Sequence, residues 1–312
     1  MKLRLYFFFI FFTFLFLFYP GDSYYFHIFA YNRSLYNNFQ EKQADLKSIN
    51  PIPYVVNYDY PSISAEGVYV VDIASFTPLF KQNENKHYYP ASTNKIMTAL
   101  VSMDNYSLED VVTIKNPLLL GTTMELVNNE KITVENLLYG ALIQSGNDAA
   151  QALADHMGNE KFVKLMNKKA KELGMHNTYF INSTGFDDSK QYTSAFDLAI
   201  VGRELLKNNH LRKTVSIKEI TISDINFKYF HKLSNVNKLL GEIHGIGGLK
   251  TGHTDGAKDN LVSMYKNNGN EYLIVVLKSD DRFFDTKQIV NWLDTSIEYF
   301  DADANYYTTN LQ

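Results

Sequence analysis

The sequence contains no cysteine among its 312 residues. Disulfide bonds, thiolate catalysis and cysteine-ligated metals are therefore excluded. An excess of basic residues is also missing, because the formal net charge is −4 at pH 7. Since nucleic-acid binding normally requires a strongly basic face, we expect no nucleic-acid partner. The hydrophobic share of 45% and the charged share of 21% are typical of a globular protein with one large or two ordinary domains.

Histidines in metal-binding patterns are absent as well. Neither an H-E-x-x-H motif nor a paired spacing occurs among His87, His156, His176, His210, His231 and His244. We therefore expect no metal site. The glycine-rich stretch "HGIGG" (244–248) lacks the context of a phosphate-binding loop, so we expect no cofactor.

The N-terminus, residues 1–23, has the layout of a signal sequence. Lys2 and Arg4 precede an uncharged apolar run from 5 to 19. This run is shorter than the ~20 residues that a membrane-spanning helix needs. No A-x-A cleavage site follows closely, and the nearest small-residue candidate is Ala30. We expect export to the outer face of the cell membrane with this segment as the anchor; cleavage and secretion are the alternative.

Residues 24–59 indicate a flexible spacer. They are rich in Asn, Gln, Lys and Tyr and include Pro51 and Pro53, which do not favour regular structure. We expect a folded domain at 60–302 and a short tail at 303–312.

Strand patterns stand near both ends of this expected domain, and helical patterns fill its middle. Apolar and β-branched runs predict strands at 67–74, 78–82, 248–254, 260–266 and 272–279. Apolar residues at helical spacing predict helices at 92–103, 133–144, 149–157, 162–173, 194–208 and 286–300. One sheet formed from the two ends and covered by helices is the most economical architecture.

The stretch "PASTNKIMTALV" (90–101) places Ser92 three positions before Lys95. A serine ahead of an apolar run often only caps a helix. At i and i+3, however, two side chains share one helix face. A lysine whose pKa is lowered by burial is the kind of base that a serine nucleophile needs. The stretch alone leaves both interpretations open.

Two further short motifs follow along the chain. "QSGNDAA" carries Ser145 and Asn147 between two helical patterns, where such residues usually form a turn and a cap. "GGLKTGHT" carries Lys250, Thr251 and Gly252 at the end of a probable strand, where a glycine lets another backbone approach closely. Ser-x-x-Lys, Ser-Gly-Asn and Lys-Thr-Gly in this order are far more specific than any one of them.

With these three motifs, the sequence resembles the serine D-alanyl-D-alanine carboxypeptidases among the low-molecular-mass penicillin-binding proteins. The likeness runs from about residue 61 to 300 and includes "LLYGALIQSGNDAAQALADHM", "NSTGF", "YTSAFDLA", "LKTGHTDGA" and "RFFDTKQIVNWL". It implies an α+β fold with three α-β-α layers: an antiparallel sheet from both chain ends, covering helices and a mostly helical subdomain. This is the penicillin-binding transpeptidase-like or β-lactamase-like fold.

The resemblance also implies the roles of nine residues. Ser92 would be the acylated nucleophile, Lys95 its base and Ser145 the relay of the proton to the leaving amine. The substrate-binding set would be Asn147, Lys250, Thr251, Gly252, His253 and Arg282. Within this set, Asn147 would hold the substrate amide, Lys250 would act as a fixed cation, and Arg282 would help to bind the terminal carboxylate. Two backbone N–H groups, one of them from Ser92, would form the oxyanion hole.

The sequence departs from the family pattern in two places. Lys258 and Asp259 stand where the family usually has a glycine followed by an aromatic residue, which puts the shape of the cleft rim in doubt. The common family layout also adds a β-rich second domain and a C-terminal amphipathic anchor. Since few residues follow Phe300 here, we expect attachment to the membrane through the N-terminal segment.

The function that the resemblance implies is removal of the terminal D-alanine from peptidoglycan stem peptides in the cell wall, with β-lactams as covalent inhibitors. A D,D-endopeptidase that cuts cross-links would use the same residues. A β-lactamase is a weaker alternative, because no Glu begins the E-x-x-L-N pattern that usually carries its deacylating carboxylate. A non-catalytic binding module is expected to have lost Ser92, Lys95 or Lys250, and all three are present.

Overall fold

The computed structural model describes residues 2–17 and 51–300. The chain divides into two units, Met1–Ile49 with Asp301–Gln312 and Asn50–Phe300. In the first unit the described element is helix α1 (Lys2–Leu17), whose side chains from 6 to 14 are exposed. Within the described ranges, no helix combines the length and apolar character needed to cross a bilayer. The expected tail at 303–312 and most of the expected spacer lie outside the described residues.

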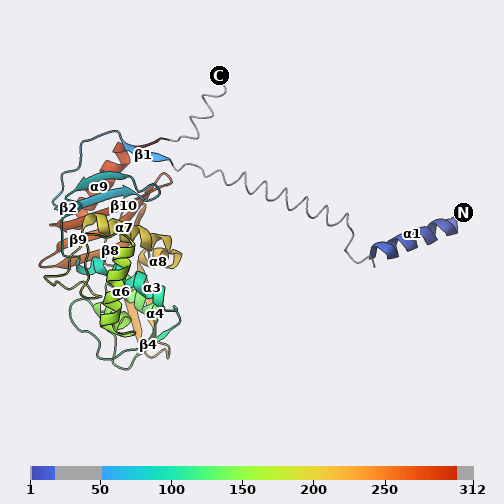
Figure 1. The fold of residues 1–312 in the computed structure, drawn as a ribbon, viewed down its shortest axis with the longest axis horizontal. Coiled ribbons are helices and arrows are strands. Elements are labelled where there is room, and N and C mark those ends of the chain that lie inside the picture. The colour runs from blue at the N-terminus through green and yellow to red at the C-terminus, as the bar shows by residue number, and fades with distance from the viewer. Residues whose placement is uncertain (1, 18–50, 301–312) are drawn as a thin grey trace, which may run out of the picture. The chain divides into compact units, whose positions relative to one another are not determined.

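The second unit is built on a five-stranded antiparallel sheet with the strand order β3-β2-β10-β9-β8 (Figure 1). Its strands are β2 (Gly67–Asp72), β3 (Pro78–Gln82), β8 (Ile246–Thr254), β9 (Lys258–Asn267) and β10 (Asn270–Ser279). The pairing of β2 with β10 joins the two ends of the domain. The predicted sheet of both chain ends is therefore confirmed.

The two faces of the sheet are covered by different helices. Along β2, Val68 and Val70 pack in the cluster that holds α9 (Arg282–Ser296), whereas Tyr69 and Val71 pack in the cluster that holds α7 (Ala195–Lys207). Successive strand side chains point to opposite faces, so an apolar run of this kind needs cover on both sides. Burial of each large apolar side chain contributes roughly 1.5–3 kcal/mol. The result is the predicted three-layer α-β-α arrangement.

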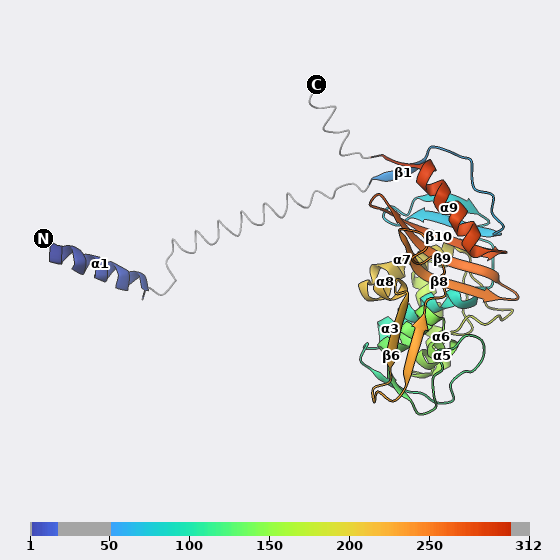
Figure 2. The same ribbon diagram turned by 180° about the vertical axis from the view of Figure 1, so that it is seen from behind.

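The helical subdomain lies beyond the β8 end of the sheet, where Figures 1 and 2 both show α3 and α6. Its helices are α3 (Lys95–Asn105), α4 (Val134–Tyr139), α5 (Asn147–Asp155) and α6 (Asn159–Glu172), with α8 (Asn209–Val215) near β8. The predicted helix at 133–144 begins as expected, with the Thr133 hydroxyl accepting from Asn136 N. It continues as a π-helical segment, η2 (Gly140–Gln144).

Three strand pairs were not anticipated correctly from the sequence. Two small hairpins, β4 (Val111–Thr113) with β5 (Lys131–Thr133) and β6 (Glu219–Ser223) with β7 (Phe230–Ser234), lie within the helical part. The third pair is β1 (Ile52–Val55) with β11 (Ile297–Phe300).

The β1–β11 pair corrects two expectations at the ends of the domain. The helix predicted for 286–300 ends at Ser296, because Ile297 and Tyr299 alternate with the exposed Glu298 and Phe300. Alternation of this kind is the period of a strand and not of a helix. Residues 52–55, which composition places in the spacer, form strand β1 and pair with β11.

Candidate active site

Ser92 and Lys95 meet at the junction of a short 3₁₀ turn, η1 (Ala91–Asn94), with helix α3. Lys95 Nζ lies 2.8 Å from Ser92 Oγ. In a 3₁₀ turn, residues three apart stand almost directly above one another, which brings the two side chains together. Ser92 is partly exposed, whereas Lys95 is 0% exposed. The hydroxyl therefore faces the outside, and its nitrogen partner lies in the interior.

The surroundings of Lys95 favour a neutral amine. Besides Ser92, its Nζ contacts Asn147 Oδ1 at 2.7 Å and the carbonyl oxygen of Thr184 at 2.8 Å. These two oxygens only accept, so a neutral amine satisfies them with its two N–H groups and directs its lone pair at the Ser92 hydroxyl. Burial lowers the pKa of Lys95 to about 7, although the charge of Asp148 acts in the opposite direction. The arrangement is that of a nucleophile and a general base.

Asp148 is buried beside this pair and organises the loop that faces it. Its carboxylate accepts hydrogen bonds from Met124 N at 2.9 and 3.1 Å and from Leu126 N at 3.0 Å. Neither Asp148 nor Thr184 was singled out from the sequence. Both stand inside stretches quoted for the family resemblance, "QSGNDAA" and "NSTGF", but nothing in the sequence showed which atoms they would contact.

Ser145 and Asn147 come from the turn between η2 and α5. Ser145 adopts the left-handed conformation (φ 66°, ψ 26°), and this directs its side chain out of the helical path. Asn147 begins α5, and its Nδ2 donates to Leu120 O at 2.9 Å while its Oδ1 contacts Lys95. A π-helical turn followed by a left-handed residue is an uncommon geometry that often marks functional sites.

Lys250 reaches the same turn from strand β8. Its Nζ donates to Ser145 Oγ at 2.8 Å and to Thr251 O at 2.9 Å. Burial lowers the pKa of Lys250 well below its usual value, and the positive charges of Lys95 and Arg282 lower it further. The expected role of Lys250 as a fixed cation stays a prediction, and a substrate carboxylate that meets its Nζ would stabilise the ammonium form.

Gly252 permits close contact between strand β8 and the nucleophile. A Cβ at this position would stand 2.9 Å from Ser92 N and 2.9 Å from Ala91 Cβ. Any side chain at 252 would therefore cover the Ser92 N–H, the expected oxyanion donor. The glycine is required by this approach and not by an unusual backbone conformation.

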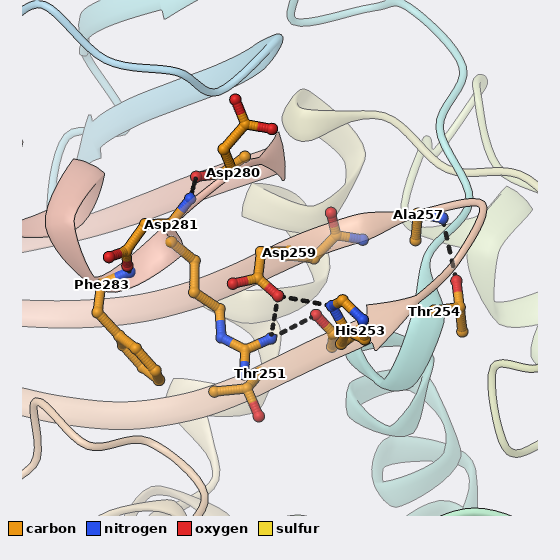
Figure 3. A network of polar contacts seen from close by, with 12 residues as sticks. Thr251, His253, Thr254, Ala257, Asp259, Asp280, Asp281 and Phe283 are labelled. Carbon is orange, nitrogen blue, oxygen red and sulfur yellow. Dashed lines mark hydrogen bonds and ion pairs between the residues drawn. The ribbon is translucent and has the colours of Figure 1, made fainter.

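Hydrogen bonds join Arg282, His253 and Asp259 in a polar network beside Gly252, and Figure 3 labels His253 and Asp259 within it. Arg282 Nη1 donates to Gly252 O at 2.8 Å and to Asp259 Oδ1 at 3.2 Å. His253 Nδ1 contacts the same carboxylate oxygen at 2.7 Å, and its side chain is 64% exposed. Burial lowers the pKa of Arg282, which Asp259 partly offsets. The part of Asp259 in this network was not predicted.

The nine residues proposed from the sequence fall into three connected groups. In the first group, Lys95 contacts Ser92 and Asn147. In the second group, Lys250 contacts Ser145 and Thr251. In the third group, Arg282 contacts Gly252 and is joined to His253 through Asp259. Strand β8 and turn η1 hold the groups together, since Gly252 packs on Ala91 and Ser92. The geometry suits acyl transfer through a serine.

The chain matches one family model over residues 55–281, described as D-alanyl-D-alanine carboxypeptidase of peptidase family S11. It is 35% identical over 237 residues to the D-alanyl-D-alanine carboxypeptidase DacF of Bacillus subtilis, covering 73% of this chain and 61% of that protein. With DacC of Escherichia coli it is 34% identical over 252 residues, covering 74% and 62%. The chain thus spans about three fifths of the length of these two relatives.

A similar fold is found among solved structures. The crystal structure of the Streptomyces K15 DD-transpeptidase has a TM-score of 0.70 and 31% identity, covering 75% of this chain and 98% of that one. A putative penicillin-binding protein homologue from Mycobacterium tuberculosis has a TM-score of 0.72 at 25% identity, covering 76% and 93%.

Proposed function

Because the chain belongs to the D-alanyl-D-alanine carboxypeptidase family of serine peptidases, we propose that it removes the terminal D-alanine from peptidoglycan stem peptides. The reaction proceeds through an acyl-enzyme on Ser92. The observation that carries this proposal is the 2.8 Å contact between Ser92 Oγ and Lys95 Nζ. Lys95 is fully buried, and burial lowers its pKa to about 7.

In the acylation step, Ser92 Oγ attacks the carbonyl carbon of the penultimate D-alanine. The hydroxyl proton passes to the lone pair of Lys95, which points at it because the other two contacts of Nζ are acceptors. The developing oxyanion is stabilised by backbone N–H groups, including that of Ser92, which Gly252 leaves uncovered.

Collapse of this intermediate breaks the C–N bond to the last D-alanine. Ser145 relays to the leaving nitrogen the proton that Lys95 took from Ser92, so Lys95 is a neutral amine again, and the contact of Ser145 with Lys250 Nζ holds the hydroxyl in place. Asn147 binds the substrate amide. Water then attacks the Ser92 ester, Lys95 accepts a proton from that water, and the shortened peptide leaves as Ser92 regains its hydrogen.

The same proposal includes covalent acylation by penicillin, because a β-lactam presents a strained amide to the same nucleophile. Labelled penicillin should give a stable adduct, and peptide mapping should locate it at Ser92. An undiminished adduct in Ser92→Ala would contradict the assignment.

The decisive experiment is mass spectrometry of the products from a synthetic stem peptide that ends in D-Ala-D-Ala. We expect loss of one alanine by the wild-type chain and no loss by Ser92→Ala. The matched control is Ser102→Ala, which removes a hydroxyl bonded only to Thr98 O within α3 and should leave turnover intact. No alanine release by a folded wild-type chain would refute the proposed reaction.

The D,D-endopeptidase alternative differs only in the leaving amine. Residues that meet a carboxylate on the leaving amine decide between these reactions.

We further propose that the apolar N-terminal segment directs the chain out of the cytoplasm and attaches it to the outer face of the membrane. Support comes from Lys2 and Arg4 ahead of an uncharged run and from the exposed apolar side chains of α1, such as Phe8 and Phe9. N-terminal sequencing of the mature protein combined with fractionation tests this. Soluble protein that begins near Tyr31 would mean a cleaved signal peptide instead.

A further inference from the structure

Arg282, the residue expected to meet the terminal carboxylate of the substrate, already has a carboxylate partner in this chain. One of its terminal nitrogens, Nη1, donates both to Gly252 O and to Asp259 Oδ1, at 2.8 and 3.2 Å. The same Asp259 oxygen contacts His253 Nδ1 at 2.7 Å. Figure 3 shows the side chains of His253 and Asp259 pointing toward one another.

The position of Asp259 is fixed by the sheet. In the β8–β9 pairing, His253 stands opposite Asp259, and directly opposed residues project from the same face of a sheet. Arg282 is held from the other side as the first residue of α9, where its guanidinium lies 4.9 Å from the ring centre of Phe283. The side chains of Arg282 and Asp259 are only 12% and 22% exposed. The contact is thus built from two rigid elements.

This contact changes what Arg282 offers to a ligand. Arginine usually binds a carboxylate through two nitrogens of its planar fork. Here Nη1 is engaged by the chain, and the negative charge of Asp259 opposes a second carboxylate brought to the same place. A leaving amine without a carboxylate meets no such opposition.

Given the proposed function, we propose that Asp259 is a specificity-determining residue that weakens the preference for a free terminal carboxylate. The enzyme then also accepts D-alanyl amides whose leaving amine carries no carboxylate, besides peptides that end in D-Ala-D-Ala. A D-alanine joined to a side-chain amine in a cross-link is an amide of this class. Asp259 acts through Arg282 and takes no part in bond making.

The test compares two stem peptides that differ only at the end, D-Ala-D-Ala with a free carboxylate and the same peptide with a terminal carboxamide. The measured quantity is the ratio of their kcat/KM values. In the full wild-type chain we expect the carboxylate peptide to be preferred by less than about tenfold. In Asp259→Asn, which keeps an acceptor oxygen but removes the charge, the ratio should rise by about tenfold, the size of one partly buried charge pair.

Asp280→Asn is the matched control. Asp280 pairs with Lys258 at 2.9 Å and is 72% exposed, so its removal deletes a nearby negative charge without touching Arg282. Figure 3 shows its carboxylate pointing away from the His253–Asp259 pair. The ratio should stay at the wild-type value. An equal rise in Asp280→Asn would overturn the proposal, because general surface charge would then be the cause.

A ratio that falls in Asp259→Asn would show that Asp259 only positions Arg282 for the substrate carboxylate, and an unchanged ratio would show no role; either overturns the proposal. The wild-type ratio is informative without any variant, since a preference above about a hundredfold for the carboxylate peptide would also overturn it. Failure of the proposed function gives a different result, in which neither peptide is cleaved and penicillin leaves Ser92 unmodified. That result would overturn this inference as well.

Discussion

The hydroxyl of Ser145 accepts a hydrogen bond of 2.8 Å from Lys250 Nζ, although the two residues lie 105 positions apart. Ser145 belongs to the turn after η2 in the helical subdomain, and Lys250 belongs to strand β8 of the sheet. The bond therefore connects the two parts of the domain at the point where Lys95 and Ser92 also meet.

We expect the two buried lysines to respond differently to pH and to substitution. The working form of Lys95 is the neutral amine, and its pKa is about 7. Acylation by penicillin should therefore increase about tenfold per pH unit below 7 and level off above it. Stopped-flow acylation between pH 5 and 9 measures this. Lys95→Arg should abolish acylation because a guanidinium stays protonated; wild-type rates in this variant would exclude the base role.

Replacement of Lys250 should affect peptide turnover through Ser145 and the substrate carboxylate. Lys250→Ala loses both the donor to Ser145 and the cation, so we expect kcat/KM for a D-Ala-D-Ala peptide to fall by roughly a hundredfold. Lys250→Arg keeps a donor and a charge and should fall by only about tenfold. Steady-state kinetics of both variants test this order, and an equal loss in the two would argue against a role for the charge.

Gly252→Ala should block acylation without unfolding the domain. The new Cβ would lie 2.9 Å from Ser92 N, so the N–H would be closed to an oxyanion and acylation should drop roughly 100- to 1,000-fold. Gly247→Ala in the same strand is the control, because its Cβ meets Met264 Cε, the end of a flexible side chain, at 2.6 Å. Similar penicillin binding by the two variants would contradict the proposed oxyanion site.

A buried ion pair outside the site should make stability depend on pH. His231 Nε2 contacts Glu130 Oε1 at 2.7 Å, and its Nδ1 contacts Met124 O at 2.8 Å. Both partners accept, so both ring nitrogens carry hydrogen and the imidazole is charged. Burial alone lowers the pKa of His231, but the hydrogen bond and charge of Glu130, the hydrogen bond to Met124 O and the charge of Asp148 together raise it.

Because the folded pKa of His231 lies above 6.5, the stabilisation is fully present below pH 6.5 and is lost as pH rises through the folded value. Wild type should exceed His231→Gln in unfolding free energy by about 1–3 kcal/mol at pH 6, and this margin should shrink by pH 9. Denaturant titrations at the two pH values measure it. The exposed His87→Gln serves as control, and a margin that grows with pH would show that the imidazole is neutral in the folded state.

The sequence predicted those elements of the fold whose pattern is contained in a short stretch of residues. The β2–β3 hairpin, the strands β8 to β10 and the helices from α3 to α7 each have a clear period and recognisable ends. The catalytic motifs stood out because their residue types and order are specific. The contacts that these residues make could not be predicted in the same way. The hydrogen bond from Lys95 to Thr184 O, for example, depends on how segments far apart in the sequence pack together.

Two features that the sequence did not predict rest on pairing between remote residues. The β1–β11 pair joins segments of only four residues each, and segments this short do not indicate a strand without their partner. The contact of Asp259 with Arg282 depends on strand register and on the position of helix α9. The sequence showed a charged residue, Asp259, where the family usually has an aromatic one, but it did not show that Arg282 would be its partner.

The pairing of β2 with β10 also has a kinetic consequence. Residues 67–72 remain without their central neighbour until residues 272–277 are available, so the sheet closes only after nearly the whole domain has been synthesised. Contacts between such distant segments slow folding, because a large loop must be closed before they form. Until then the β2–β3 hairpin, apolar on both faces, is too small to be stable alone and is open to aggregation. A nascent chain of this protein therefore depends on its last strands to protect its first.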